Sequence, residues 1–264
     1  MSYTNSPLVS YTKISPNQSG TRTHAIDRIT PHCVVGQCSV EALGSLFAQA
    51  SVQASSNYGI GADGRVGIYV PESNRSWCSS SASNDHRAVC IECASDAYHP
   101  FAFKDVVYQK LITLCVDICK RNGKNKLIWL GDKDKTLAYT PKSNEMVLTV
   151  HRWFEAKSCP GDWLMARMDD LASKVTAQLS GAADTTPEPK TLDVYYPWKV
   201  YTNGSTEEPV YKDTDFTEQT GSLNPYEQCY CTGRYGDAYA VLYKIDGTED
   251  RWAVGYVDYD GGVG

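Results

Sequence analysis

The sequence predicts an α/β domain, with a mixed central β-sheet flanked by helices, followed by a small all-β module. Amphipathic helical patterns alternate with short apolar runs of strand type over residues 25–180. Residues 191–264 instead contain alternating Tyr, Val and Trp residues and no convincing helical pattern. The segment between them, 181–190, has no apolar periodicity and contains two prolines. We therefore expect a larger domain at 1–180, a linker at 181–190 and a β-module at 191–264.

The first elements of the larger domain follow from local patterns. Residues 1–24 form an extended, turn-rich lead-in, and the alternating run 26–30 predicts a strand that ends at Pro31-His32-Cys33. Ser39 is a good helix N-cap, and apolar residues follow it at helical spacing up to Ala50. Residues 55–70 are typical of two strands joined by the Ala-Asp-Gly turn at 62–64.

The second half of this domain continues the alternation of strands and helices. The Ser- and Asn-rich segment 71–85 is expected to be a long loop that walls a cleft. Residues 88–94 predict a buried strand, 103–119 an amphipathic helix that stops at Gly123, and 127–130 another strand. A strand then leads to His151, and a helix opened by Pro160 runs to Leu179.

Composition excludes several classes of protein. The 264 residues carry a formal net charge of −6, which argues against a general nucleic-acid-binding protein. The sequence has no apolar run long enough to span a membrane, and its polar N-terminus has no signal-peptide core. Without a secretion signal, most of the ten cysteines are expected to be buried free thiols. Cys33 and Cys38 are close enough in sequence for a small disulfide if the protein reaches the outside of a cell.

The most informative stretch is VLTVHRWFEAKSCPGDWL, residues 147–164. It places His151, Lys157 and Cys159 within nine positions, and Pro160 opens the following helical pattern. A cysteine just before a helix N-terminus is favoured as a thiolate, and a thiolate beside an imidazole is half of a zinc site. The third ligand should be a His at another strand end. Among the five histidines, His32 fits best because it follows a strand and precedes a helix.

The order of these parts resembles that of the zinc N-acetylmuramoyl-L-alanine amidases, the fold relatives of peptidoglycan recognition proteins and of amidase-type phage lysozymes. The resemblance covers roughly residues 25–180, and its most specific part is His151, Lys157 and Cys159 followed by Pro-Gly. It implies that His32, His151 and Cys159 bind Zn²⁺ and that Lys157 is the family's catalytic lysine. It also implies hydrolysis of the amide between N-acetylmuramic acid and L-alanine in peptidoglycan.

The catalytic base is expected to be Glu92. Some family members have a catalytic Tyr on the hairpin, but here that position is Ser56, and Tyr58 lies two residues further on. The segment NDHRAVCIEC, residues 84–93, resembles the bacterial and prophage branch, in which a Glu serves. Glu92 would move the proton from water to the leaving nitrogen, and Lys157 would stabilise the oxyanion. The alternative for Glu92 is a buried, salt-bridged structural carboxylate.

The C-terminal stretch DAYAVLYKIDGTEDRWAVGYVDYDGGV, residues 237–263, resembles bacterial SH3-like cell-wall-binding modules. The implied partner is peptidoglycan, both its glycan strand and its stem peptide, with neither nucleic-acid binding nor membrane insertion. A tethered binding module raises the effective concentration of a catalytic domain at an insoluble polymer. A purely structural or dimerising role is the alternative. The expected localisation is synthesis in the host cytoplasm and action on the wall after release, or non-classical export.

Two other functions remain open at this point. One is a non-catalytic peptidoglycan-recognition protein, which would be expected to lose a metal ligand. The other is a cysteine peptidase with Cys33 or Cys159 as nucleophile, which needs no metal. Trp77, Trp153 and Asn84 are possible contacts for sugar or peptide along the cleft.

Overall fold

A computed structural model describes residues 3–180, 194–235, 237–245 and 252–258 of the chain. The chain divides into two compact units, Met1–Asp184 and Thr185–Gly264, and each is described by itself. The linker predicted at 181–190 lies outside the described residues.

The first unit contains strands and helices in alternation. Its strands are β1 (Val9–Thr12), β2 (Gln18–Thr21), β3 (Arg28–Cys33), β4 (Tyr58–Ile60), β5 (Val66–Ile68), β6 (Asn74–Ser76), β7 (Ala88–Cys93), β8 (Lys126–Ile128) and β9 (Glu145–Leu148). Its α-helices are α1 (Val40–Phe47), α2 (Ala82–Asp85), α3 (Asp105–Arg121), α4 (Lys133–Ala138), α5 (Asp162–Met165) and α6 (Met168–Leu179). Two short 3-10 helices are η1 (Ala50–Val52) and η2 (His151–Trp153).

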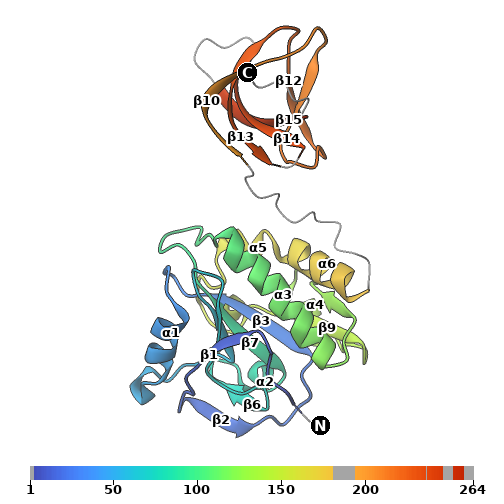
Figure 1. Ribbon diagram of the computed structural model, residues 1–264. Coiled ribbons are helices and arrows are strands. Elements are labelled where there is room, and N and C mark those ends of the chain that lie inside the picture. Colours follow the sequence, from blue (N-terminus) through green and yellow to red (C-terminus); the bar gives the residue numbers. More distant parts are fainter. Residues whose placement is uncertain (1–2, 181–193, 236, 246–251, 259–264) are drawn as a thin grey trace. The chain divides into compact units, whose positions relative to one another are not determined.

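A seven-stranded mixed sheet forms the centre of this unit, in the order β1-β5-β4-β7-β3-β9-β8 (Figure 1). Only the hairpin strands β4 and β5 pair antiparallel, and the other neighbours are parallel. Strands β2 and β6 form a separate antiparallel pair. The predicted mixed α/β fold is therefore confirmed.

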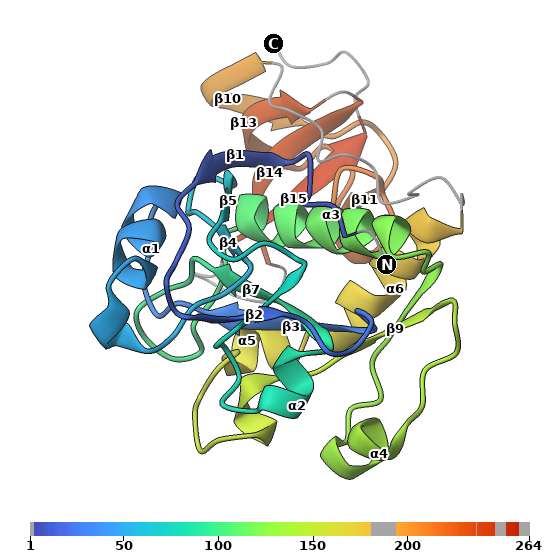
Figure 2. The same cartoon turned by 90° about the horizontal axis from the view of Figure 1, so that it is seen from below.

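Helices α3 and α6 pack together against one face of the sheet (Figure 2). In α3 the residues at helical spacing, including Val107, Leu111, Leu114 and Ile118, are buried against this face. The helix ends just before Gly123, whose φ of +67° is the left-handed conformation that favours glycine. No helix in the described ranges is long and apolar enough to cross a membrane.

Two shorter helices, α1 and α2, pack separately on the opposite face of the sheet. Helix α1 packs Leu43 and Phe47 against Tyr69. It approaches closely because Gly59 lacks a side chain, since a Cβ there would lie 2.7 Å from Tyr69 and 2.8 Å from Leu43. Helix α2 contacts β7. The rest of this face is free to carry polar side chains.

Three sequence-based expectations for this unit were wrong. The segment 71–85 is not a plain loop, because it contains β6, which pairs with β2, and α2. The strand expected over 26–30, ending at Pro31-His32-Cys33, runs instead from Arg28 to Cys33, because β3 pairs with β7 along its whole length. The helix expected from Pro160 to Leu179 is broken into α5 and α6, which are separated by Ala166 and Arg167.

The second unit is an antiparallel six-stranded sheet in the order β10-β13-β14-β15-β11-β12. Its strands are β10 (Val194–Thr202), β11 (Glu208–Tyr211), β12 (Gln219–Leu223), β13 (Gln228–Tyr235), β14 (Ala238–Lys244) and β15 (Trp252–Asp258). Its core includes Tyr201, Cys231, Tyr239 and Val241. The all-β arrangement is consistent with the predicted SH3-like module.

Candidate metal centre and active site

His32 lies on the polar face of the central sheet. Side chains alternate along a strand, so Ile29 enters the core with α3, whereas Arg28, Thr30 and His32 share the other face. His32 is only 1% exposed, and its register partner on β7 is Glu92.

The three predicted metal ligands, His32, His151 and Cys159, come together. One ligand atom from each lies within 4.8 Å of the other two. The Sγ of Cys159 is 3.2 Å from Nδ1 of His32, and the rings of His32 and His151 are 5.1 Å apart between centroids. His151 begins the turn η2, and the turn is fixed because the Arg152 amide donates to the Cys159 carbonyl oxygen over 3.1 Å.

The two imidazoles have the properties of metal ligands. Nε2 of His32 and Nε2 of His151 are both buried without a hydrogen-bond partner, which is rare for a polar atom in a folded protein. Burial lowers the pKa of His32 to about 3 and also lowers the pKa of His151. Both rings are therefore neutral at neutral pH, and the neutral imidazole is the form that binds a metal. This donor set of two imidazoles and one thiol fits Zn²⁺.

Glu92 lies beside this ligand set. Its Oε1 is 3.9 Å from Nδ1 of His32, and its side chain is 18% exposed. Burial, and secondarily the nearby Cys33, raise the pKa of Glu92 to about 8. A carboxyl group with a pKa near neutrality can both accept and return a proton.

A cavity of about 440 Å³ opens next to the ligands and is lined by His151, Glu155, Lys157 and Trp77, among others. Lys157 is half-exposed, and its Nζ lies 3.8 Å from Oε1 of Glu155. Glu155 also accepts a hydrogen bond from the Ser80 hydroxyl, and its Oε2 lies 3.8 Å from Nε2 of His151. The cavity therefore offers a cationic donor, a carboxylate and an aromatic wall around the same opening.

A family comparison covers the part of the chain that carries these residues. The family model described as N-acetylmuramoyl-L-alanine amidase matches residues 21–162, a range that contains all the site residues named above. The chain belongs to the N-acetylmuramoyl-L-alanine amidase family. No curated protein sequence matches the chain.

Several solved structures are similar to the amidase. A selenomethionine derivative of AmpD is 19% identical and covers 65% of this chain and 99% of its own, with a TM-score of 0.45. The N-acetylmuramoyl-L-alanine amidase LysC from Clostridium intestinale is 16% identical and covers 63% and 94%, with a TM-score of 0.44. A mutant endolysin from Bacillus subtilis is 16% identical and covers 62% and 97%, with a TM-score of 0.40.

The protein is thus a hydrolase that cuts the amide bond between N-acetylmuramic acid and L-alanine in peptidoglycan. The predicted enzyme class and substrate are confirmed, and a recognition protein without catalytic activity is not favoured.

The expected environment of Cys159 in the amidase needs correction. Helix α5 begins only at Asp162 and has four residues, so no long helix dipole acts on the thiol. Without metal, the pKa of Cys159 is raised, because its Sγ shares a hydrogen bond with Cys33 and is buried. A bound cation would be needed to hold this sulfur as a thiolate.

Tyr58, weighed as an alternative base, and Asn84, suggested as a cleft contact, are both buried away from the cavity. Tyr58 is fully buried and donates to Oε1 of Glu72 over 2.6 Å, so it is not available as a base. Asn84 is also buried, and its amide bonds to Thr30 and Ser79 rather than facing the cavity. Trp153 is part of a cavity wall and stacks on Trp129, with centroids 5.0 Å apart and ring planes within 2°.

No pattern in the sequence indicated the disulfide between Cys78 and Cys90, which lies beside His32. These two sulfurs and His32 form a second group within 4.8 Å, but a disulfide offers no thiolate to a metal. The disulfide considered between Cys33 and Cys38 is absent, and both thiols are free. Glu155 and Ser80 were also missed, because neither residue type is distinctive without its neighbours.

Proposed function

We propose that this amidase is a zinc enzyme in which His32, His151 and Cys159 hold the ion. The observation that carries the proposal is the pair of buried, unpartnered Nε2 atoms on His32 and His151 beside the Cys159 thiol. A zinc ion there would polarise the scissile carbonyl and lower the pKa of a bound water to about 7.

Glu92 would act as the general base and then as the general acid. Its position on β7, opposite His32 on β3, puts its carboxylate next to the ligands on the polar face of the sheet. A positive charge at the ligands would lower its raised pKa towards neutrality. Glu92 can then take a proton from the attacking water and deliver it to the leaving L-alanine nitrogen.

Lys157 would stabilise the charge that develops on the carbonyl oxygen. It shares the cavity with His151, and its ammonium group is a donor that can turn towards a substrate oxygen. Glu155 would act as a positioning residue, because it lies 3.8 Å from Lys157 Nζ and is itself fixed by Ser80.

The C-terminal unit would bind the cell wall. Val200, Tyr230, Leu242 and Val254 are register partners across β10, β13, β14 and β15, so they form one row on the sheet. Trp252 is 49% exposed and Val254 68% exposed, and the Trp252 ring lies 6.1 Å from that of Tyr230. Exposed aromatic rings are suited to stacking on sugars. We accordingly propose a catalytic domain at 1–180, a linker at 181–190 and a wall-binding domain at 191–264.

The decisive experiment measures metal content and bond cleavage together. We expect wild-type protein to contain one zinc ion and to release peptides with a new free L-alanine amine from purified peptidoglycan, detected by mass spectrometry. Cys159→Ala should lose both zinc and cleavage, whereas Cys38→Ala, at a half-buried thiol outside the ligand set, should retain both.

Chelation separates this proposal from a cysteine peptidase. A chelator should abolish cleavage and added zinc should restore it, because a cysteine nucleophile needs no metal. Full activity in metal-free protein would overturn the zinc assignment.

A further inference from the structure

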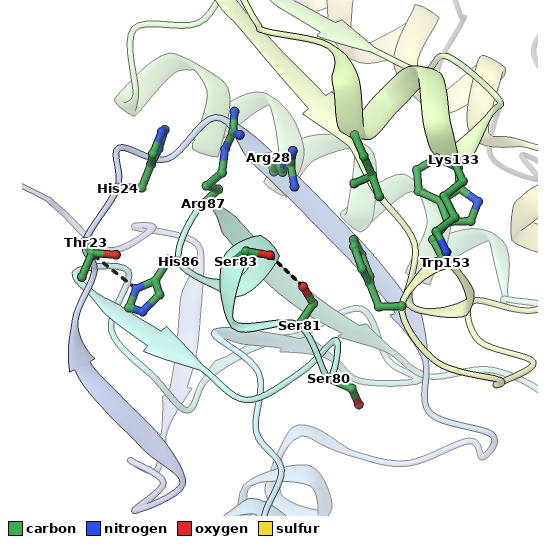
Figure 3. Close-up of a pocket in the computed structure, with 12 residues that line it drawn as sticks. Thr23, His24, Arg28, Ser80, Ser81, Ser83, His86, Arg87, Lys133 and Trp153 are labelled. Carbon is green, nitrogen blue, oxygen red and sulfur yellow. Dashed lines mark hydrogen bonds between the residues drawn. The ribbon is translucent and has the colours of Figure 1, made fainter.

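A second cavity, larger than the catalytic one, adjoins it on the same side of the sheet. Its volume is about 760 Å³. Ser80 and Ser81, drawn among its lining residues in Figure 3, also line the catalytic cavity. It therefore continues the opening at His151 rather than forming a separate hollow.

The lining of this second cavity is basic. Arg28, Arg87, Lys133, His24 and His86 contribute to it, and no Asp or Glu is among its lining residues. Figure 3 shows these side chains arriving from several segments around the hollow. Arg87 is already paired with Asp27, but Lys133 is exposed and forms no ion pair with a described residue.

Arg28 is the unusual member of this group. It is only 5% exposed, yet the one described hydrogen bond of its guanidinium is from Nη1 to the neutral Oδ1 of Asn84, over 3.2 Å. No carboxylate of the described residues forms an ion pair with it. Asp27 attracts Arg28 electrostatically but forms its ion pair with Arg87. A buried guanidinium without an ion-pair partner of its own is costly, and here it borders an open cavity. This combination points to an anionic ligand.

The position of Arg28 relative to the ligands identifies which part of the substrate could reach it. Arg28 and His32 share one face of β3 and are four residues apart, or about 13 Å along a strand. That span corresponds to about four residues of extended peptide. The stem peptide extends from the cleaved L-alanine and carries carboxylates, whereas the glycan side of the bond offers hydroxyl and acetamide groups.

We propose that Arg28 and Lys133 bind a carboxylate of the stem peptide in this second cavity and make the amidase selective for stem peptides with free acids. Trp153 and Leu137 supply an apolar wall for the methylene groups of the peptide. The proposal rests on the amidase activity and on catalysis at the ligand set of His32, His151 and Cys159.

The test uses the full-length enzyme and two synthetic muramyl tetrapeptides, one with free carboxylates beyond L-alanine and one with these groups as carboxamides. We expect wild-type KM to be roughly ten- to a hundredfold lower for the acid, as for a hydrogen bond between charged groups. Equal KM values for the two substrates in the wild type would overturn the proposal without any variant.

Variants then assign the effect to the cavity. Arg28→Gln should raise KM for the acid to the carboxamide value while kcat and the carboxamide KM stay unchanged, and Arg28→Lys should restore part of the preference. Lys133→Gln should weaken the preference, whereas Lys120→Gln, on an exposed position of α3, should not. If Arg28→Gln fails to fold, the proposal is tested by comparing Lys133→Gln with Lys120→Gln. An equal acid preference in these two variants would then overturn it.

Other outcomes have distinct meanings. An equal loss on both substrates in Arg28→Gln and Lys133→Gln would show a structural role and contradict the proposal. If Arg28→Gln and Lys133→Gln keep the preference for the acid substrate but no longer bind a polyglycerol phosphate, the cavity binds an anionic wall polymer and the proposal is overturned. A failure of the zinc assignment is separable, because it would leave Cys159→Ala active on both substrates.

Discussion

His32 and Glu92 are register partners on adjacent parallel strands, and their side chains meet on the same face of the sheet with Nδ1 and Oε1 3.9 Å apart. Parallel pairing thus brings a proposed metal ligand and a proposed base together across 60 residues of sequence (92 − 32). Because both are carried by central strands rather than loops, their separation is set by the hydrogen-bonded ladder of the sheet.

The first prediction concerns Glu92. Replacing it with Gln keeps the size of the side chain but removes the proton acceptor, so kcat should fall roughly 100- to 10,000-fold. Zinc content should be unchanged, because Glu92 is not one of the three proposed ligands. Metal analysis and cleavage of peptidoglycan on the same sample give both values. A variant with normal turnover would assign the base to another group.

The second prediction concerns Lys157. Lys157→Gln should lower kcat roughly 100- to 1,000-fold, the usual effect of removing one oxyanion donor, with little change in KM. Zinc content should again be retained. Lys174→Gln is a suitable control, since Lys174 is on α6 and pairs with Asp170 away from the ligands. A rise in KM alone would mean that Lys157 binds substrate but does not stabilise the transition state.

The third prediction concerns the stability of the metal-free protein. His32 has a pKa of about 3 when folded and about 6.5 when unfolded, so below pH 6.5 only the unfolded chain takes up this proton. The free energy of unfolding should therefore fall as the pH drops from about 6.5 towards 3.

Glu92 has the opposite effect on the pH dependence of stability. Its raised pKa of about 8 means that the folded state binds this proton more tightly than the unfolded state between about pH 4.5 and 8, so its contribution to the free energy of unfolding rises as the pH falls. The comparison is therefore best made in a Glu92→Gln background, by urea denaturation of chelated protein with and without His32→Gln. The variant lacking His32 should show the smaller loss of stability at acid pH. Identical pH dependence of both proteins would contradict the assignment to His32.

The fourth prediction concerns Tyr230 and Trp252, the exposed aromatic pair on the C-terminal sheet. Trp252→Ala combined with Tyr230→Ala should reduce the fraction of full-length protein that sediments with purified sacculi. Cleavage of a soluble muropeptide should stay at the wild-type rate, because the first unit is unchanged. Tyr226→Ala removes an exposed aromatic residue from a turn and serves as the control. Unchanged sedimentation of the double variant would exclude this aromatic pair as the wall-binding surface.

Much of the fold was predictable because its core elements have strong local patterns. The apolar spacing in 103–119 and the continuous apolar run 88–94 match α3 and β7 closely, since each is buried along its length. The hairpin around 62–64 was also predicted, because its turn residues determine its geometry.

The elements that were missed depend on contacts distant in sequence. Helix α2 is held by Asp85, which accepts hydrogen bonds from Ser79 and the Cys78 amide, and a local pattern does not show this. The disulfide of Cys78 with Cys90 joins the segment before α2 to β7, so its pairing follows from the fold and not from spacing. Buried polar contacts of this kind have no periodicity.

The proposed metal ligands could be selected from the sequence because the His151–Cys159 segment is short and distinctive. The surroundings of each proposed ligand could not be predicted in the same way. The proximity of Cys33 to Cys159, and the raised pKa that results, require the end of β3 to lie against the loop that follows η2. The selectivity for carboxylates that we infer for Arg28 likewise depends on the burial of its side chain. Arginine is mostly exposed in proteins, so the residue type alone does not suggest this burial.

The stack of Trp129 on Trp153 gives the amidase an intrinsic optical reporter. Two nearly parallel indole rings with centroids 5.0 Å apart couple excitonically, and Trp153 follows His151 by only two residues in the turn η2. Any displacement of that turn changes the ring separation and thus the circular dichroism of the pair. We therefore expect the uptake of the proposed zinc ion to be visible in solution through the protein's own chromophores, with no label attached.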